Sequence, residues 1–277
     1  MREANEQTEQ TKRGKRGRMS AGQQSYLTLL LLLLAIVGIT AATAAWFMIS
    51  DRTRVYSLSM NITAGPSLRF DVAPHATFDE YLPTLSLERI ADSVRAQQGY
   101  DMRTTPLNPV TTSDGVTFTF RDGTVVNPRS GAYWEIPLHF MASGDMIVHL
   151  TARNSAGKED GTRISSKTPN LPESMRIAFR ADGNVSVYDP GMGDSSTNFG
   201  KIRNFGLQSA TQTVYNQNSV LFPLKAETDK TVYLCVWMEG TDEACTNELK
   251  SSDFEIRLRF EGTDEEGNVL SGKRREP

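Results

Sequence analysis

The feature that most constrains this chain is an uncharged apolar run near its N-terminus, residues 27–49. A run of this length can cross the hydrocarbon core of a bilayer as a helix, which takes about 20 apolar residues. Basic residues crowd its N-terminal side and are fewer just after it: Lys12, Arg13, Lys15, Arg16 and Arg18 precede it, and Arg52 and Arg54 follow it. Because basic flanks favour the cytoplasm, we expect residues beyond the run to lie outside the cell membrane.

The run divides the chain into three expected parts. Residues 1–24 are polar and basic, which predicts a disordered cytoplasmic segment. Residues 25–49 are expected to form a transmembrane helix or a signal peptide. Residues 50–277 are numerous enough to build an extracellular domain with its own hydrophobic core.

Two fates remain open for the apolar run. The small-residue sequence Ala42-Thr43-Ala44 is typical of a signal-peptidase site, so cleavage after Ala44 or Ala45 would release the protein to the cell surface. Against cleavage, the apolar stretch continues beyond that site, which favours a permanent helix. If cleavage occurs, the continuing residues become an apolar N-terminus and a possible assembly segment: Trp46, Phe47, Met48 and Ile49.

The net charge of the expected extracellular part limits the classes of partner that it can bind. The whole chain has a net charge of −3, and the first 49 residues hold six Lys and Arg against three Asp and Glu, so the rest carries −6. An acidic exported domain is a poor candidate for binding nucleic acid. The membrane and other copies or surface proteins are the expected partners.

The two cysteines, Cys235 and Cys245, both follow the apolar run. In an oxidising compartment such an isolated pair favours a disulfide. The turn-forming residues 240–243 lie between them and would bring two strand ends together. We therefore expect a Cys235–Cys245 disulfide.

Strand patterns dominate residues 50–277 and predict an all-β fold, an antiparallel β-sandwich with jelly-roll or Greek-key connections and one short helix. The helix is expected from Ser86, a possible N-cap, to Gly99. Residues 189–213 are rich in Gly, Ser and Asn and are expected to form a surface loop. The expected strands are 55–62, 67–72, 116–120, 124–126, 133–140, 146–152, 175–181, 184–188, 219–224, 231–239 and 253–261. Asp-Gly pairs at 122–123 and 182–183 predict hairpin turns.

The sequence shows no pattern typical of a catalytic or metal site. It contains no HExxH, Walker, GxSxG or CxxC motif. If Met141 pairs with Met146 in a hairpin, His139 and His149 face opposite sides of the sheet. These observations predict a non-enzymatic protein without cofactor or metal, although acidic loops leave calcium binding open.

Residues 40–50, TAATAAWFMIS, are followed by a strand that ends in the step Ala64-Gly65-Pro66-Ser67-Leu68. This junction resembles that of TasA/camelysin-like exported Firmicutes proteins. The segments 171–179 and 232–249 also resemble blocks in clostridial surface proteins of this sort. The resemblance implies a jelly-roll-like sandwich in a Gram-positive envelope, processed by a dedicated signal peptidase and acting in biofilm matrix. The basic extension, the two cysteines and the unbroken apolar run depart from the pattern.

The favoured function is a non-enzymatic structural component of matrix or envelope assembly. The alternative is a membrane-anchored ectodomain that binds carbohydrate or protein through residues such as Trp134 or Tyr188. A pseudopilin would need a Gly-Phe-x-x-x-Glu processing site, which the sequence lacks, and a hydrolase has the least support.

Overall fold

The computed structural model describes residues 25–26, 28–37, 58–65, 67–152, 161–192, 196–199, 202–207, 219–249 and 252–270. The chain divides into two compact units, Met1–Ser50 and Asp51–Pro277. In the first unit, residues 25–26 and 28–37 are helical. Within the described ranges, no helix combines the length and apolar character that a membrane crossing requires. The predicted cleavage residues Ala44 and Ala45 and the segment 46–49 lie outside the described residues.

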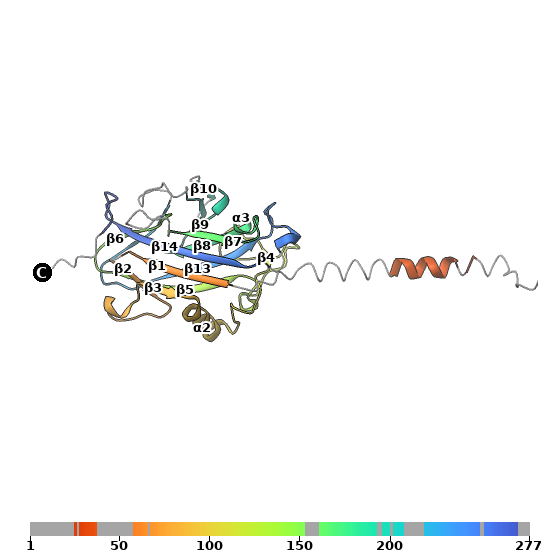
Figure 1. The fold of residues 1–277 in the computed structure, drawn as a ribbon, viewed down its shortest axis with the longest axis horizontal. Coiled ribbons are helices and arrows are strands. Elements are labelled where there is room, and N and C mark those ends of the chain that lie inside the picture. Colours follow the sequence, from red (N-terminus) through yellow and green to blue (C-terminus); the bar gives the residue numbers. More distant parts are fainter. Residues whose placement is uncertain are drawn as a thin grey trace, which may run out of the picture. The chain divides into compact units, whose positions relative to one another are not determined.

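The second unit is a β-sandwich of two sheets, as the sequence predicts (Figure 1). One sheet has the order β12-β6-β14-β1-β3, with β7 beside β14. Its strands are β1 (Leu58–Ala64), β3 (Thr84–Ser86), β6 (Met146–Leu150), β7 (Arg163–Ser166), β12 (Val220–Leu224) and β14 (Phe254–Thr263).

The other sheet has the order β10-β11-β9-β8-β13-β5-β2, with β4 beside β13. Its strands are β2 (Leu68–Asp71), β4 (Pro109–Val110), β5 (Trp134–Ala142), β8 (Met175–Ala181), β9 (Asn184–Tyr188), β10 (Ser196–Phe199), β11 (Ile202–Phe205) and β13 (Lys230–Glu239). Short helices connect them: η2 (Phe78–Glu80), α2 (Leu87–Gln98), η3 (Pro128–Ser130), α3 (Leu171–Ser174), η4 (Pro190–Met192) and η6 (Asn247–Leu249).

The expectation of purely antiparallel sheets was wrong for three strand pairs. β1 runs parallel to β14, with Leu58 opposite Phe254 and Ala64 opposite Phe260. β11 is parallel to β9, and β4 to β13. Hairpin turns reveal only antiparallel neighbours, whereas these pairings join strands that no tight turn connects.

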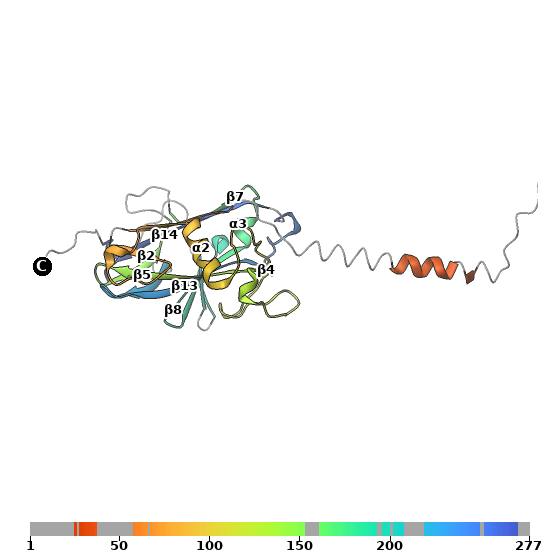
Figure 2. The same ribbon diagram turned by 90° about the horizontal axis from the view of Figure 1, so that it is seen from below.

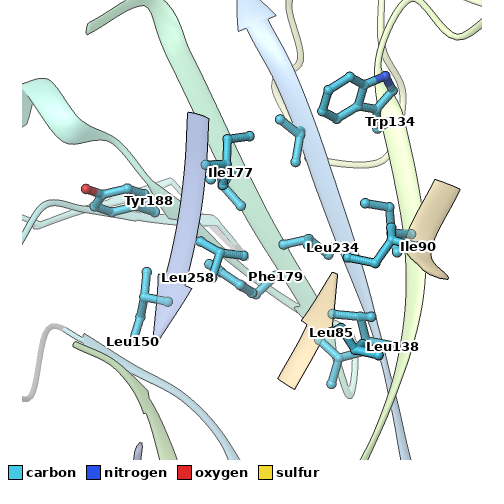
Figure 3. Packing of buried hydrophobic residues seen from close by; sticks show 14 of the residues in the cluster. Leu85, Ile90, Trp134, Leu138, Leu150, Ile177, Phe179, Tyr188, Leu234 and Leu258 are labelled. Carbon is cyan, nitrogen blue, oxygen red and sulfur yellow. The ribbon is translucent and has the colours of Figure 1, made fainter. Parts of the chain in front are cut away.

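The core lies between the two sheets and follows the alternation of their strands. Phe260 of β14 is central to it, because its ring centroid lies 5.3 Å from that of Phe140, 5.8 Å from Phe179 and 6.1 Å from Phe70. Figure 3 shows aliphatic side chains of both sheets, including Leu234 and Leu258, meeting in this layer. These edge-to-face rings fill the space between the sheets.

The predicted helix is confirmed as α2, with Ser86 as N-cap and Gly99 as a left-handed C-cap at φ 85°. Its apolar stripe is buried, as the spacing requires: Leu87, Ile90, Ala91 and Val94. The helix contacts β1 and β3 of one sheet and β5 of the other. It therefore closes one open side of the sandwich, as the view in Figure 2 shows.

The two Asp-Gly turns are present. Asp182 and Gly183 both have positive φ and join β8 to β9, the geometry of a two-residue hairpin. At the other turn Gly123 has φ 84°, and an isolated bridge links Thr119 to Val125. The expected strands 116–120 and 124–126 are thus reduced to single bridges.

The predicted hairpin of the strands carrying His139 and His149 was wrong. β5 pairs with β13 and β2, whereas β6 pairs with β12 and β14 in the other sheet. The connection at residues 143–145 therefore crosses from sheet to sheet. Both strands have an inward apolar face, and a sandwich satisfies both by placing them in opposite layers.

The loop expected at 189–213 also contains strands, β10 and β11. Ile202 and Phe205 of β11 are buried. β11 has four residues, and these two are its only apolar ones. Because Gly, Ser and Asn residues surround them, the sequence shows no clear strand pattern there.

Candidate functional site

A long connection, residues 111–132, covers part of the outer face of the second sheet, and we call it the flap. Phe118 of the flap stacks on Tyr133 with ring centroids 3.9 Å apart and meets Trp237 edge-on at 5.3 Å. These rings form a second hydrophobic cluster with outward side chains of the sheet, Ala178, Val185, Val187, Ile202 and Cys235. Gly115 permits the approach, because a Cβ at this residue would lie 2.6 Å from Val185 Cγ1.

A cavity of about 360 Å³ lies where the flap meets the end of the sheet. Its apolar floor is formed by Val187, Ile202 and Trp237 of three strands. Arg176, Asn204 and Glu239 supply the polar lining, and Thr112 and Ser113 of the flap complete it. The volume falls within the usual range for small-molecule sites, and the mixed lining is typical of them.

Arg176 is held in place by carboxylates beside the cavity. Its Nε lies 3.1 Å from Asp189 Oδ2, and its Nη2 pairs with Asp242. Nη1 donates a 3.0 Å hydrogen bond to the Met175 carbonyl. The guanidinium is therefore already committed to groups of the domain.

Asp189 is buried, and burial raises its pKa above the usual value. Arg176 acts in the opposite direction, while the negative charges of Asp242 and Glu239 raise the pKa further. Burial is the main cause of the raised pKa, and the two neighbouring carboxylates add to it.

Glu239 retains a free acceptor position. Its Oε2 accepts a hydrogen bond from Trp237 Nε1 at 3.0 Å, and Oε1 accepts two from Thr241, at 3.1 Å and 2.7 Å. A carboxylate offers about four acceptor positions. Within the part of the chain that the structure describes, one acceptor position on Oε2 therefore has no donor.

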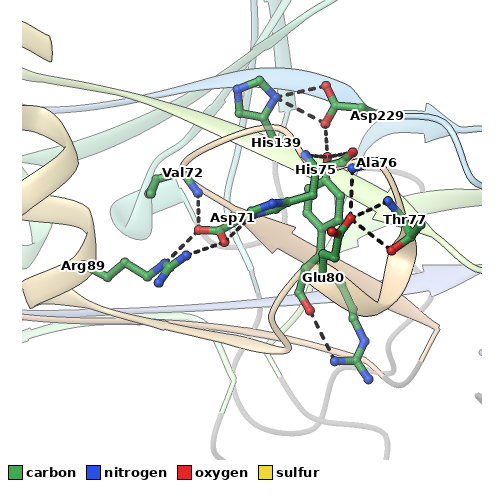
Figure 4. A network of polar contacts seen from close by, with 11 residues as sticks. Asp71, Val72, His75, Ala76, Thr77, Glu80, Arg89, His139 and Asp229 are labelled. Carbon is green, nitrogen blue, oxygen red and sulfur yellow. Dashed lines mark hydrogen bonds and ion pairs between the residues drawn. The ribbon is translucent and has the colours of Figure 1, made fainter.

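A second polar cluster centres on Asp71, at the end of β2 (Figure 4). Arg89 of α2 donates to both of its oxygens, at 2.8 Å and 2.6 Å. His75 Nε2 lies 2.8 Å from Oδ2, and the Val72 N–H donates to Oδ1 at 2.7 Å. Although burial raises the pKa of Asp71, these hydrogen bonds outweigh it and hold the pKa below the usual value.

The cluster continues through Tyr81 toward β5. The Tyr81 hydroxyl donates to Asp229 at 2.7 Å and accepts from the His75 N–H at 2.9 Å. His139 Nδ1 lies 3.0 Å from the other oxygen of Asp229. Burial, together with the hydrogen bond to Asp229, raises the pKa of Tyr81 to about 12. The chain of contacts ties α2, β2, β5 and the start of β13 together, which is a structural role.

The predicted Cys235–Cys245 disulfide is absent, and both thiols are free. Cys235 points to the outer face of the second sheet, within the cluster beneath the flap. Cys245 packs instead against the main core on the other side. Side chains alternate along β13, and the turn after Glu239 leads the chain away from the Cys235 side.

We expect two free thiols in the folded protein, with Cys235 the less reactive. Burial raises the pKa of Cys235 to about 12 and that of Cys245 to about 11, and reactivity follows the thiolate form. Alkylation without reductant, followed by mass analysis, should add one label at Cys245 in the native state and two after denaturation. A denatured species that takes no label would contradict this.

Trp134 and Tyr188, proposed as binding residues of the alternative function, are wrong for that role. Their side chains are buried in the main core (Figure 3). Both residues occupy inward positions of their strands, so neither can form an exposed platform.

The three histidines lie in two separate places in the fold. His75 and His139 belong to the cluster in Figure 4, whereas His149 is buried between Ser219 Oγ, at 3.2 Å, and Thr263 Oγ1, at 3.0 Å. Within the described part of the chain, no three His, Cys, Asp or Glu side chains are grouped as metal ligands would be.

Comparison with family models, with curated proteins and with solved structures finds no match to this chain.

Sequence reasoning missed the cavity because its lining comes from β8, β9, β11, β13 and the flap, which are widely separated in the chain. The only local signal was the alternation of β13, which places Trp237 and Glu239 on one face.

Proposed function

We propose that this chain is an exported, non-enzymatic cell-surface β-sandwich that takes part in the assembly of the envelope or extracellular matrix. The apolar run 27–49 serves as its membrane anchor, or as a leader removed on export. A jelly-roll-like arrangement in a Gram-positive envelope and biofilm matrix is what the resemblance to TasA/camelysin-like proteins implies.

The position of β1 is the observation that carries this proposal. The first described strand after the apolar run lies inside its sheet, between β14 and β3, rather than at an edge. The second unit therefore begins its described part with a strand that is paired on both sides. This pairing suits a domain held at a surface.

The N-terminus of the protein recovered from native cells tests the proposal. Cell fractionation with N-terminal mass mapping should place the protein in the envelope or the medium, starting either at Met1 or directly after Ala44 or Ala45. Recovery of the chain in the cytoplasmic fraction would contradict the proposal.

The cavity beneath the flap favours a second candidate function, a membrane-anchored ectodomain that binds a ligand. Its volume of about 360 Å³ and its combination of an apolar floor with polar walls support this candidate. The two functions are compatible in one surface protein.

A further inference from the structure

We propose that the cavity beneath the flap binds a primary alkylammonium group, with the methylene stem on the apolar floor and the charged nitrogen against Glu239. The proposal rests on the second candidate function and is independent of self-association. It assigns a ligand class to a cavity formed by residues of five separate segments.

The charge balance of the cavity favours a cation. Glu239 and Arg176 are the charged residues that line the cavity, and Asp189 and Asp242 pair with Arg176. Because Asp189 and Asp242 already bind Arg176, Glu239 is the carboxylate left to meet a ligand. An anion entering the cavity would meet an excess of negative charge.

The hydrogen-bonding groups that line the cavity also favour a cationic ligand. The free position on Glu239 Oε2 is an acceptor, and an ammonium group has donors only. Among the described residues, the Asn204 amide has no hydrogen-bond partner, so its oxygen can accept a second ammonium N–H. Charge-assisted hydrogen bonds of this kind are stronger than neutral ones.

The floor explains why the cation should carry an aliphatic stem. Val187, Ile202 and Trp237 present apolar surface to the cavity. Trp237 is nearly fully buried and meets Phe118 in an edge-to-face contact, so little of its ring surface is open to a ligand. This favours contact with methylene groups over stacking of a ring.

An alkylammonium group can come from a free amine or from a lysine side chain, so the test has two arms. Isothermal titration of the full chain in nonionic detergent should use cadaverine in one arm and Nα-acetyl-lysine methylamide in the other. The uncharged 1,5-pentanediol, with the same stem as cadaverine, is the matched ligand control. Saturable binding of either amine without binding of the diol supports the proposal, and the tighter amine identifies the source.

Two substitutions make the test specific. Glu239→Gln should weaken amine binding at least about tenfold, because it removes the charge that the nitrogen meets. Glu243→Gln makes the same charge change at an exposed neighbouring residue outside the cavity and should leave the affinity within about twofold. Asn204→Asp adds a carboxylate to the cavity without touching the Trp237 contact, and it should tighten binding.

The proposal fails if neither amine binds saturably, if the diol binds as tightly as cadaverine, or if Glu239→Gln has no effect. If Glu239→Gln lowers the unfolding temperature so far that it cannot be titrated, the Asn204→Asp variant alone tests the proposal. Amine binding by Asn204→Asp that is unchanged or weaker than that of the wild type then overturns the proposal. None of these results affects the assembly role, which is measured by light scattering.

Discussion

Replacing Asp71 by Asn should lower the free energy of unfolding by about 2–3 kcal/mol at neutral pH, because it removes the charge from a buried, paired carboxylate. Asp71 is fully buried, whereas the Arg89 side chain is 48% exposed and can return to water. We therefore expect a smaller loss of unfolding free energy than the largest losses that follow when a buried ion pair is broken. For a domain of this size the melting temperature should fall by roughly 4–12 °C.

The pH dependence of this effect has a defined sign. The pKa of Asp71 is lower in the folded protein than its usual value, mainly because hydrogen bonds from Arg89 and His75 outweigh burial. Its ionised form therefore adds stability above the unfolded pKa of about 3.9, and that stability is lost as pH falls through the folded pKa. The difference between wild type and Asp71→Asn should shrink below about pH 4.

Thermal unfolding of the full chain at pH 7 and pH 3 measures both effects. Asp79→Asn is the matched control, since Asp79 is exposed on η2 a few residues away and should change stability by less than about 0.5 kcal/mol. Equal melting temperatures for wild type and Asp71→Asn at pH 7 would show that the cluster in Figure 4 contributes nothing to stability.

Protein that begins at Trp46 should self-associate, whereas protein that begins at Asp51 should stay monomeric. The longer form carries Trp46, Phe47, Met48 and Ile49 as an apolar end, and burying these side chains is worth several kcal/mol at ~25 cal/mol per Å². The expected site is a sheet edge or a groove of a neighbouring copy, reached by strand addition.

Light scattering of both forms at matched concentration tests this. A double variant of the longer form, Trp46→Ser with Phe47→Ser, keeps the length but removes the aromatic surface and should return it to the monomer. If the Trp46 form is monomeric at all concentrations, the assembly role loses its physical basis.

The sequence predicted those features that depend on neighbours in the chain. Helix α2 followed from its apolar stripe and Gly99, and the β8–β9 hairpin from Asp182-Gly183. The sandwich itself followed from many short strand patterns separated by turn signals. In each case a short segment contains its own structural signal.

Features that depend on distant segments were missed. The cysteine spacing indicated a disulfide, but Cys235 lies in the cluster beneath the flap, whereas Cys245 follows β13 and packs against the main core. The parallel β1–β14 pair and the change of sheet between β5 and β6 leave no local signal. The cavity required the flap to fold over Trp237, which is a tertiary event.

The parallel pairing of β1 with β14 has a mechanical consequence. Seven residues of β1, from Leu58 to Ala64, lie in register with β14. Tension between the chain before β1 and the chain after β14 would pull the two strands from opposite ends of their ladder. The backbone hydrogen bonds would then be loaded together in shear instead of opening one after another, so β1 would act as a force-bearing clamp.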